Sequence, residues 1–425
     1  MRYLYFNFDM SKNIKEKNFI LFAYIILGLA FISLFVNLAI ARLTHSQGNS
    51  ASSPNAQIIV DADLISSEVS DSSAISVLMS KLENIQSKIE KSTYERLPFY
   101  HTLVGLSRKY NQLIGWNYVS YGEYNGVTTL SDGMLTTQVP PRDVTANALA
   151  VADLSKYCEE NGAKLLYVQA PHKISPLEDS DISGFSDFSN QNADALLKEL
   201  EAYQVDYLDL RAKITEDNLA PHSLFYKTDH HWTLTTGIWA SEKILEYCNS
   251  KYIWNADLSK LDINNFDLVT YPDLFLGSQG KKVSLLCAAP EDFVVPYPKY
   301  ETLFSYKIPE LQMDCTGDYS ICYDKVALEK GDYYKKNPYA ACNYGDRALI
   351  QITNQLEADG HSILFVHDSF GDCVLSTLTL AEKEVTALDL RYYNGDLKSY
   401  IEKHKPDLVI MLYNAGTVGG ENFNV

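Results

Sequence analysis

The sequence is poor in basic residues and in tryptophan. Its 425 residues include 36 Lys and Arg against 54 Asp and Glu, a formal net charge of −18, and only 4 Trp beside 30 Tyr and 17 Phe. Proteins bind nucleic-acid phosphates through basic faces, so this shortage of positive charge argues against a DNA or RNA partner. The many tyrosines are consistent with contact to sugars but are not diagnostic of it.

Cysteine is also scarce and has no recognisable pattern. The seven cysteines form no C-x-x-C pair and lack the spacing of zinc ligands. A disulfide scaffold is therefore excluded, although Cys315 and Cys322 lie close enough in sequence to pair outside the cell. We expect no metal centre and no cofactor. A hydrophobic content of 46% with 21% charged residues predicts a globular protein.

One long apolar segment stands near the N-terminus. Residues 19–41 carry no charge, and about 20 such residues span a membrane as a helix. Arg2, Lys12, Lys15 and Lys17 precede this segment. The positive-inside rule therefore predicts a cytoplasmic N-terminus (1–18), a signal-anchor helix and an extracytoplasmic remainder. The alternative is a cleaved signal peptide, because Ala39 and Ala41 resemble a cleavage site, but its apolar stretch is usually shorter.

Two further regions follow the predicted anchor. Residues 42–96 are interpreted as a Ser-rich tether that continues into an amphipathic helix. In that helix, Ile75, Leu78, Leu82, Ile85 and Ile89 follow a heptad-like spacing. Two heptads favour a helix that docks on the domain over a dimerising coiled coil, which usually needs three or more.

From about residue 97 the pattern becomes that of an α/β domain. Apolar strands alternate with helices of ten to fifteen residues, which predicts βαβ units and a mainly parallel sheet. Helices are expected at 145–160, 192–203, 373–381 and 397–404, and strands at 164–170, 205–210, 362–366, 385–390 and 408–413. Residues 251–360 lack clear periodicity and are interpreted as an irregular insertion within the domain 97–425.

A serine follows one of these strands directly. Ser369 stands in the run His367-Asp368-Ser369-Phe370-Gly371, between a predicted strand and a predicted helix. A serine at such a turn presents its hydroxyl beside a helix N-terminus, which favours nucleophilic catalysis. The alternative is that Asp368 or Ser369 only caps the helix.

A second motif supplies a base for that serine. Asp229-His230-His231-Trp232 precedes a probable helix, and imidazole has a suitable pKa for deprotonating a serine during attack. If the motif is extended, alternate side chains share a side, so Asp229 orients His231 while His230 points away. A metal site built from these residues and His222 is the less favoured alternative, because adjacent residues of an extended strand face apart.

Asp229-His230-His231-Trp232 also resembles the signature of the bacterial DHHW-motif proteins, which are similar to the alginate O-acetyltransferase branch of the SGNH hydrolase-like superfamily. The resemblance implies an SGNH-like three-layer sandwich, in which Asp229 and His231 precede the nucleophile Ser369 in the chain. Residues 168–173, which include Gln169 and Lys173, are similar to the Pro-x-Lys stretch of those proteins. In one departure, His367 replaces the glycine that usually precedes Asp-Ser.

Five more residues are candidates for oxyanion or substrate binding. Asn414, at the end of the last predicted strand, resembles the oxyanion-hole Asn of the superfamily, although a turn-forming Asn-x-Gly explains it equally well. The other four are Lys173 and Gln169 in the Pro-x-Lys stretch, and His230 and Tyr226 in or beside the Asp229 motif.

These residues predict a membrane-anchored, extracytoplasmic O-acyltransferase with a Ser-His-Asp triad. The resemblance supplies the acetyl group, the cell-surface polysaccharide acceptor and, by analogy, a multi-pass membrane acyltransferase that provides the acetyl donor. An acetyl esterase with the same triad is the first alternative, since no motif reports whether water or a sugar accepts the acyl group. A non-catalytic polysaccharide-binding or assembly protein is the second.

Overall fold

The computed structural model of the chain describes six stretches of residues. They are 99–114, 118–119, 126–130, 132–175, 186–421 and 423. The predicted cytoplasmic segment, membrane anchor, tether and amphipathic helix lie outside these residues. Within them, no helix has both the length and the apolar character that crossing a membrane requires.

Contacts within the chain define two compact units, Met1–Asn125 and Gly126–Val425. In the described part of the first unit lie helix α3 (Tyr100–Leu113) and the short strand β1 (Tyr118–Val119). The second unit contains the α/β domain and both predicted motifs.

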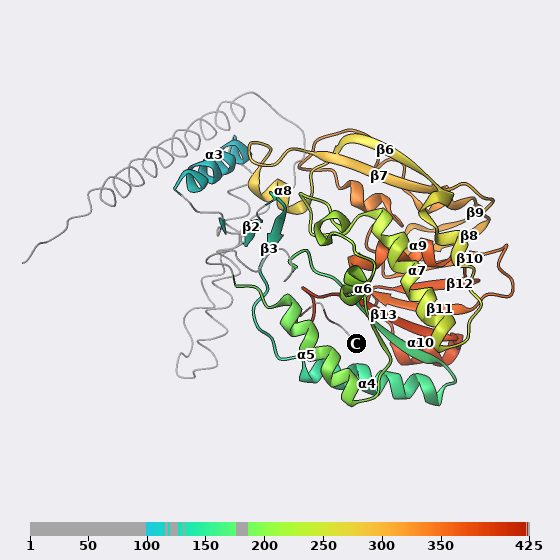
Figure 1. Ribbon diagram of the computed structural model, residues 1–425. Coiled ribbons are helices and arrows are strands. Elements are labelled where there is room, and N and C mark those ends of the chain that lie inside the picture. Colours follow the sequence, from blue (N-terminus) through green and yellow to red (C-terminus); the bar gives the residue numbers. More distant parts are fainter. Residues whose placement is uncertain are drawn as a thin grey trace, which may run out of the picture. The chain divides into compact units, whose positions relative to one another are not determined.

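An eight-stranded sheet forms the centre of the second unit, in the order β5-β4-β13-β11-β12-β10-β8-β9 (Figure 1). The first five strands in this order run parallel to one another. They are β5 (Tyr207–Asp209), β4 (Lys164–Ala170), β13 (Leu408–Asn414), β11 (Ser362–His367) and β12 (Glu384–Leu388). All five were predicted, and β4, β11 and β13 have the continuous apolar runs that are typical of strands buried on both faces.

The other three strands extend the sheet with antiparallel pairings. They are β10 (Leu349–Asn354), β8 (Phe304–Ile308) and β9 (Met313–Gly317). The sheet is therefore mixed, and the prediction of a mainly parallel sheet was wrong in this half. β8 and β10 are short and alternate buried with less buried residues, as antiparallel strands with one wetter face do.

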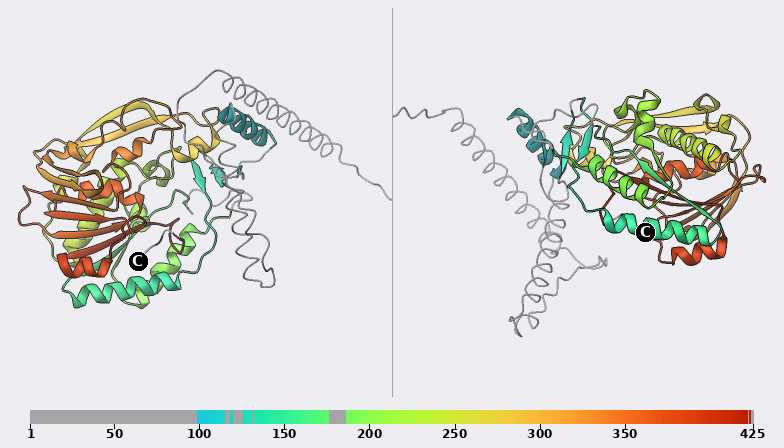
Figure 2. Two further views of the ribbon diagram at one scale, coloured as in Figure 1. Left: turned by 180° about the vertical axis from the view of Figure 1, so that it is seen from behind. Right: turned by 60° about the horizontal axis from the view of Figure 1, so that its bottom comes forward.

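Helices cover both faces of the sheet, which gives three layers (Figures 1 and 2). Apolar residues of α4 (Thr145–Glu160), α5 (Ser189–Ala202) and α10 (Leu397–His404) pack on one face. Residues of α6 (Leu210–Glu216), α7 (Leu234–Lys251) and α9 (Asp372–Leu378) pack on the other. The three-layer α/β arrangement is thus the one that the sequence predicted.

Local sequence explains where several of these helices begin and end. The Asp396 carboxylate accepts a hydrogen bond from the Ser399 N–H and caps α10, and Thr233 caps α7 in the same way. After α4, Gly162 adopts a φ of 83°, a conformation that glycine takes without a steric penalty. The predicted helices at 145–160 and 397–404 match α4 and α10.

The predicted irregular insertion contains more regular structure than expected. Besides β8, β9 and β10, residues 251–360 form the antiparallel pair β6 (Phe266–Phe275) and β7 (Glu291–Pro298), with helix α8 (Ser278–Val283) between them. Short 3₁₀ helices complete this region: η4 (Leu258–Leu261), η5 (Ile263–Asn265), η6 (Pro309–Leu311), η7 (Tyr319–Cys322) and η8 (Pro338–Ala341). Nearer the N-terminus of the unit, β2 (Val127–Thr129) pairs with β3 (Leu135–Thr137).

None of the seven cysteines, all of which are described, forms a disulfide. Cys315 and Cys322, the pair closest in sequence, are both thiols. The domain is held together by its core and hydrogen bonds rather than by covalent cross-links.

Candidate active site

Ser369 lies where β11 ends and the 3₁₀ helix η9 (Ser369–Gly371) begins. The Asp368 carboxylate caps this turn by accepting the Phe370 N–H at 3.0 Å. The same carboxylate accepts the Asn414 N–H at 3.2 Å and the Thr417 hydroxyl at 2.9 Å. Asp368 therefore ties the serine turn to the end of the neighbouring strand β13.

The second motif forms a closed loop. Phe225 and Trp232 pair as an antiparallel bridge, and the Tyr226 N–H donates to the His231 carbonyl at 3.1 Å. The extended conformation that we assumed for this stretch was wrong. Within the loop the Asp229 carboxylate accepts the backbone N–H of His231 at 3.0 Å, so a turn rather than strand alternation brings these two residues together.

Asp229, His231 and Ser369 form a continuous hydrogen-bonded series. The His231 Nδ1 lies 2.6 Å from Asp229 Oδ1, and its Nε2 lies 2.7 Å from the Ser369 hydroxyl oxygen. In addition, the Trp232 indole N–H donates to the Phe370 carbonyl at 2.8 Å, which joins the two motifs directly. The structure thus brings together all three residues that the sequence predicted as a triad.

Helix α8 closes the far side of Asp229. The Ser278 N–H donates to Asp229 Oδ2 at 2.6 Å. Burial alone raises the pKa of the Asp229 carboxyl, but His230, His231 and the hydrogen bonds from His231 and Ser278 outweigh it and hold this pKa well below its ordinary value. Asp229 is therefore a buried carboxylate that accepts hydrogen bonds from both sides.

The His231 ring contacts two other rings, a tilted His230 ring and a stacked Tyr339 ring. The His230 centroid lies 3.8 Å away, and that of Tyr339 lies 4.0 Å away with nearly parallel planes at 11°. The Tyr339 hydroxyl also donates to the Ser369 carbonyl at 3.2 Å. Sequence reasoning missed Tyr339 and Ser278, because both come from the segment without periodicity and match no motif.

Two of the candidates for oxyanion or substrate binding, Lys173 and Gln169, form hydrogen bonds inside the protein. The Lys173 ammonium, whose residue is 1% exposed, donates to the backbone carbonyls of Leu135, Tyr226 and Asp229. The Gln169 amide donates to the carbonyls of Ala170 and Tyr413 and lies fully inside the sheet. The polar groups of both side chains therefore bind backbone carbonyls of the protein.

The other three candidates differ in exposure. Tyr226 is buried, and its ring packs against those of Phe275 and Phe293. The Asn414 amide donates to the Pro171 carbonyl at 2.7 Å while its oxygen accepts the Gly416 N–H at 2.7 Å, which matches the turn-forming alternative. His230 is 45% exposed at its side chain and is the candidate that meets solvent beside His231.

The residues of the metal alternative are only partly together. Potential ligand atoms of Asp229, His230 and His231 all lie within 4.8 Å of one another. However, the Asp229 carboxylate and His231 Nδ1 already hydrogen-bond to each other. His222, the fourth residue of that hypothesis, lies 2.7 Å from the Asp132 carboxylate instead.

His367 is accommodated at the position directly before Asp368 and Ser369. Its Nδ1 lies 2.7 Å from the Asp368 carbonyl, and burial lowers the pKa of its imidazole. A Cβ added to Gly371 would lie 2.5 Å from the His367 Cβ, so the glycine two residues after the serine provides the space. The histidine therefore fits beneath the turn without displacing Ser369.

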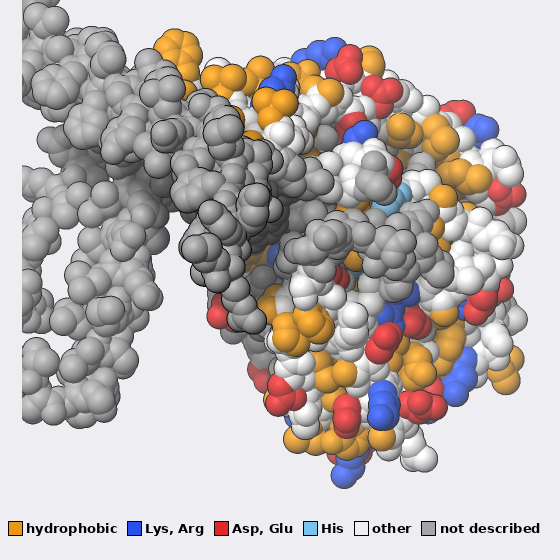
Figure 3. All heavy atoms as spheres, turned by 60° about the vertical axis from the view of Figure 1, so that its left-hand side comes forward, with side chains coloured by type: hydrophobic (Ala, Val, Ile, Leu, Met, Phe, Trp, Pro, Cys, Tyr) orange, Lys and Arg blue, Asp and Glu red, His pale blue; other side chains and the backbone are white. Residues whose placement is uncertain are grey.

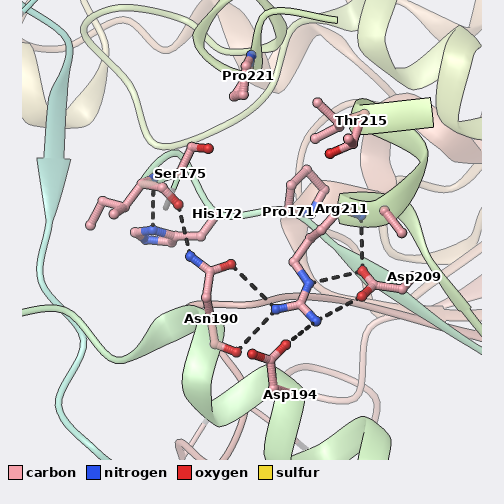
Figure 4. A pocket seen from close by; sticks show the side chains of 12 residues that line it. Pro171, His172, Ser175, Asn190, Asp194, Asp209, Arg211, Thr215 and Pro221 are labelled. Atoms are coloured by element: carbon pink, nitrogen blue, oxygen red, sulfur yellow. Dashed lines mark hydrogen bonds and ion pairs between the residues drawn. The ribbon is translucent and has the colours of Figure 1, made fainter. Parts of the chain in front are cut away.

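A cavity of about 310 Å³ lies at the carboxyl ends of β4 and β5 (Figure 4). Pro171 and His172 follow β4, and Asp209 and Arg211 stand at the end of β5. The Arg211 guanidinium forms two hydrogen bonds with the Asp209 carboxylate, at 2.9 and 2.8 Å, and an ion pair with Asp194 at 2.8 Å. Ligands of open parallel sheets bind at this edge, where Ser369 also lies.

Charge is evenly mixed on the described surface that Figure 3 shows. Lys and Arg side chains are scattered among Asp and Glu, with hydrophobic side chains between them. That face offers no continuous basic stripe of the kind that nucleic-acid binding uses.

Part of the chain matches a family of known proteins. Residues 130–255 match the family model of the SGNH hydrolase-like domain of the acetyltransferase AlgX. The match includes the Asp229-His230-His231-Trp232 motif and confirms the predicted resemblance. No curated protein matches the chain in sequence.

Solved structures share the fold. Bacillus cereus PatB1 is 20% identical with a TM-score of 0.58, over 70% of this chain and 98% of that one. PatB1 with a sulfonyl adduct gives a TM-score of 0.56 at 20% identity, over 70% and 97%. A DHHW family protein from Eubacterium siraeum gives 0.54 at 14% identity, over 70% and 92%. At these identities the likeness establishes the fold.

Proposed function

We propose that the chain is an extracytoplasmic O-acetyltransferase that modifies a cell-surface polysaccharide through an acetyl-serine intermediate. The single observation that carries this proposal is the hydrogen-bonded series from Asp229 through His231 to Ser369. The match of residues 130–255 to an acetyltransferase domain supports the choice of acyl group and reaction.

In the first half-reaction the Ser369 oxygen attacks the carbonyl carbon of the acetyl donor. His231 Nε2 takes the hydroxyl proton, and Asp229 stabilises the imidazolium that forms. When the tetrahedral intermediate collapses, the bond to the donor oxygen breaks and that oxygen takes the proton from His231. The products are acetyl-Ser369 and the deacylated donor.

In the second half-reaction a sugar hydroxyl of the acceptor replaces the donor. His231 removes the hydroxyl proton while the sugar oxygen attacks the acetyl carbonyl, and the Ser369 oxygen then leaves and regains a proton from His231. The acceptor gains an ester, and the enzyme returns to its starting state. With water in place of the sugar, the same steps give the esterase alternative.

We place the acceptor chain along the carboxyl edge of the sheet, over the cavity of Figure 4. Ser369 follows β11 and Pro171 follows β4, with β13 between these strands. Two strand spacings amount to about 10 Å, a distance that a polysaccharide bridges with neighbouring sugars. Asp194, whose side chain is 68% exposed at the cavity, offers a carboxylate to sugar hydroxyls.

Membrane attachment is part of the same proposal. Residues 19–41 would anchor the chain with its domain outside the cytoplasm, and a multi-pass membrane acyltransferase would bring the acetyl group across. This arrangement places the domain beside the polysaccharide that it modifies.

The experiment that tests the chemistry is intact-mass analysis of the full-length chain in detergent, with the Ser369→Ala variant as control. After brief exposure to an activated acetyl ester, the parent protein should gain one acetyl group and the variant none. Phenylmethanesulfonyl fluoride should label the same residue, as suggested by the sulfonyl adduct in PatB1. Folded protein that takes neither label would favour the binding-protein alternative.

Adding candidate acceptors to the acetylated protein then separates the two enzymatic alternatives. Loss of the acetyl group to a polysaccharide, faster than to water, indicates a transferase. Loss to water at an unchanged rate whatever glycan is present indicates an esterase.

A further inference from the structure

The loop that carries Asp229 and His231 is held from one side by a buried cation. The Lys173 ammonium donates to the carbonyls of Leu135 at 2.7 Å, Tyr226 at 2.6 Å and, in a shorter contact, Asp229. Lys173 follows β4, and its ammonium contacts the loop at the Tyr226 and Asp229 carbonyls. Lys173 thereby provides a charged donor to three backbone carbonyls.

A carboxylate holds the same loop from the other side. Glu291, the first residue of β7, accepts the backbone N–H groups of Lys227 and Thr228, both at 2.7 Å, and the Thr228 hydroxyl at 2.5 Å. The cation therefore takes loop carbonyls, and the carboxylate takes loop N–H groups. Hydrogen bonds to charged groups are stronger and shorter than those between neutral groups.

These contacts surround the position from which His231 must reach Ser369. The Tyr226 and Asp229 carbonyls bound by Lys173 bracket the N–H groups bound by Glu291, and the His231 backbone is bound to Asp229 and Tyr226. A shift of the loop would move Asp229 Oδ1 and His231 Nδ1 relative to Ser369. Misplacements of about 1 Å in such a series cost roughly 10²-fold in rate.

We propose that Lys173 and Glu291 are positioning residues that set the geometry of the Asp229-His231-Ser369 series, an inference that rests on the proposed function of that series. Neither side chain contacts the reacting atoms. Lys173 acts by fixing the Tyr226 and Asp229 carbonyls within the loop, and Glu291 acts by fixing the N–H groups of the two residues between them.

The arrangement predicts a distinctive dependence on pH. Burial lowers the pKa of Lys173 to about 7, against the opposing influence of Asp229, Glu291 and Asp132. A neutral amine has two hydrogens for three carbonyls, whereas the ammonium has three. Turnover should therefore decline as the pH rises through the Lys173 pKa, and Lys173→Arg, which keeps its charge, should remove that decline.

The test compares Lys173→Met and Glu291→Gln in the full-length chain with Lys260→Met. Lys260, in η4, is a partly buried lysine paired with Glu357, so its variant controls for loss of a paired lysine. With an activated acetyl ester as substrate, Lys173→Met should lower kcat about 10²-fold at a nearly unchanged KM. Glu291→Gln, which keeps one acceptor oxygen, should lower kcat less, and Lys260→Met should leave it unchanged.

A proton NMR spectrum gives a second measurement that does not need activity. The His231 Nδ1–H donated to Asp229 should appear as a far-downfield signal in the parent and in Lys260→Met, and should be lost or shifted in Lys173→Met. A folded Lys173→Met protein with the parent kcat and the parent signal would overturn the inference. If the parent turns over no ester yet Lys173→Met loses the signal, the proposed function fails while the positioning role stands.

Discussion

Gly277 and Asp229 lie so close that a side chain on the former would occupy the space of the latter. A Cβ built on Gly277 would stand 2.3 Å from the Asp229 Cβ and 2.5 Å from the Thr228 carbonyl oxygen. This approach lets the next residue, Ser278, donate its N–H to the Asp229 carboxylate at 2.6 Å. The space beside the predicted catalytic carboxylate is thus created by a glycine nearly fifty residues further along the chain.

Replacing this glycine should damage the site more than the fold. We expect Gly277→Ala to displace α8 from Asp229 and to lower acetyl-ester turnover by about 10²-fold. The matched control is Gly162→Ala at the end of α4, where a φ of 83° makes alanine costly by about 1 kcal/mol but no reacting group is near. Thermal melting and kcat measured on both variants check this. Equal activity in the two would contradict it.

Asp229 should make both activity and stability sensitive to acid. Its pKa in the fold lies below that of the unfolded chain, so between these two values the unfolded state binds more protons. The free energy of unfolding contributed by this group is therefore present above pH 4 or so and is lost as the pH falls through the folded pKa. Urea titrations at several pH values should show a shallower acid loss in Asp229→Asn.

The same variant should be nearly inactive at neutral pH. An asparagine cannot stabilise the imidazolium of His231, and the loss expected for such a change is about 10⁴-fold in kcat. A folded Asp229→Asn protein that retains parent turnover would show that His231 works without this partner.

Tyr339 should contribute to turnover through two contacts that can be removed separately. Tyr339→Phe removes the hydrogen bond to the Ser369 carbonyl, worth about 1 kcal/mol or roughly fivefold in kcat if it acts on the transition state. Tyr339→Leu also removes the ring stacked on His231 and should cost about tenfold more. Tyr319→Phe, which loses a buried bond to Ser376 elsewhere, is the control. Identical kinetics for both Tyr339 variants would exclude a role for the stacked ring.

The cavity at the ends of β4 and β5 should matter for the polysaccharide and not for a small ester. Thr215→Trp places a large ring in this space. We expect KM for an acceptor polysaccharide to rise roughly tenfold, a loss of about 1.4 kcal/mol of binding, while turnover of a small acetyl ester stays unchanged. Thr270→Trp, on the exposed part of β6, controls for an added surface tryptophan. An unchanged KM would exclude the cavity as the acceptor site.

The parallel half of the fold and the three residues of the series were predictable from local signals. Strands such as 164–170 and 408–413 are apolar runs of six or seven residues between helices, a length that is typical of buried strands. The Asp229 motif and Ser369 each stand beside a predicted element, so the order of elements placed them at one edge of the sheet.

The supports of that series were not predictable, because they depend on tertiary contacts. Gly277, Ser278, Glu291 and Tyr339 belong to a stretch whose short strands and 3₁₀ helices have no sustained period. Lys173 was singled out, but only as a substrate-binding candidate, since nothing in the sequence reports that its ammonium meets three carbonyls. The sequence correctly paired Asp229 with His231, but it predicted this from alternation along an extended segment, whereas a turn brings the two residues together.

The place of β13 in the sheet has a consequence for biosynthesis. This strand, residues 408–414, lies between β11 and β4. It therefore joins β4 and β5, which come early in the chain, to β11 and the strands beyond it, which come later. While these residues are still in the ribosome, the two halves share no edge and Asp368 has no Asn414 to bind. The two groups of strands can therefore pair into one sheet only after residues 408–414 have been added to the growing chain, because β13 is the strand that pairs with both β11 and β4.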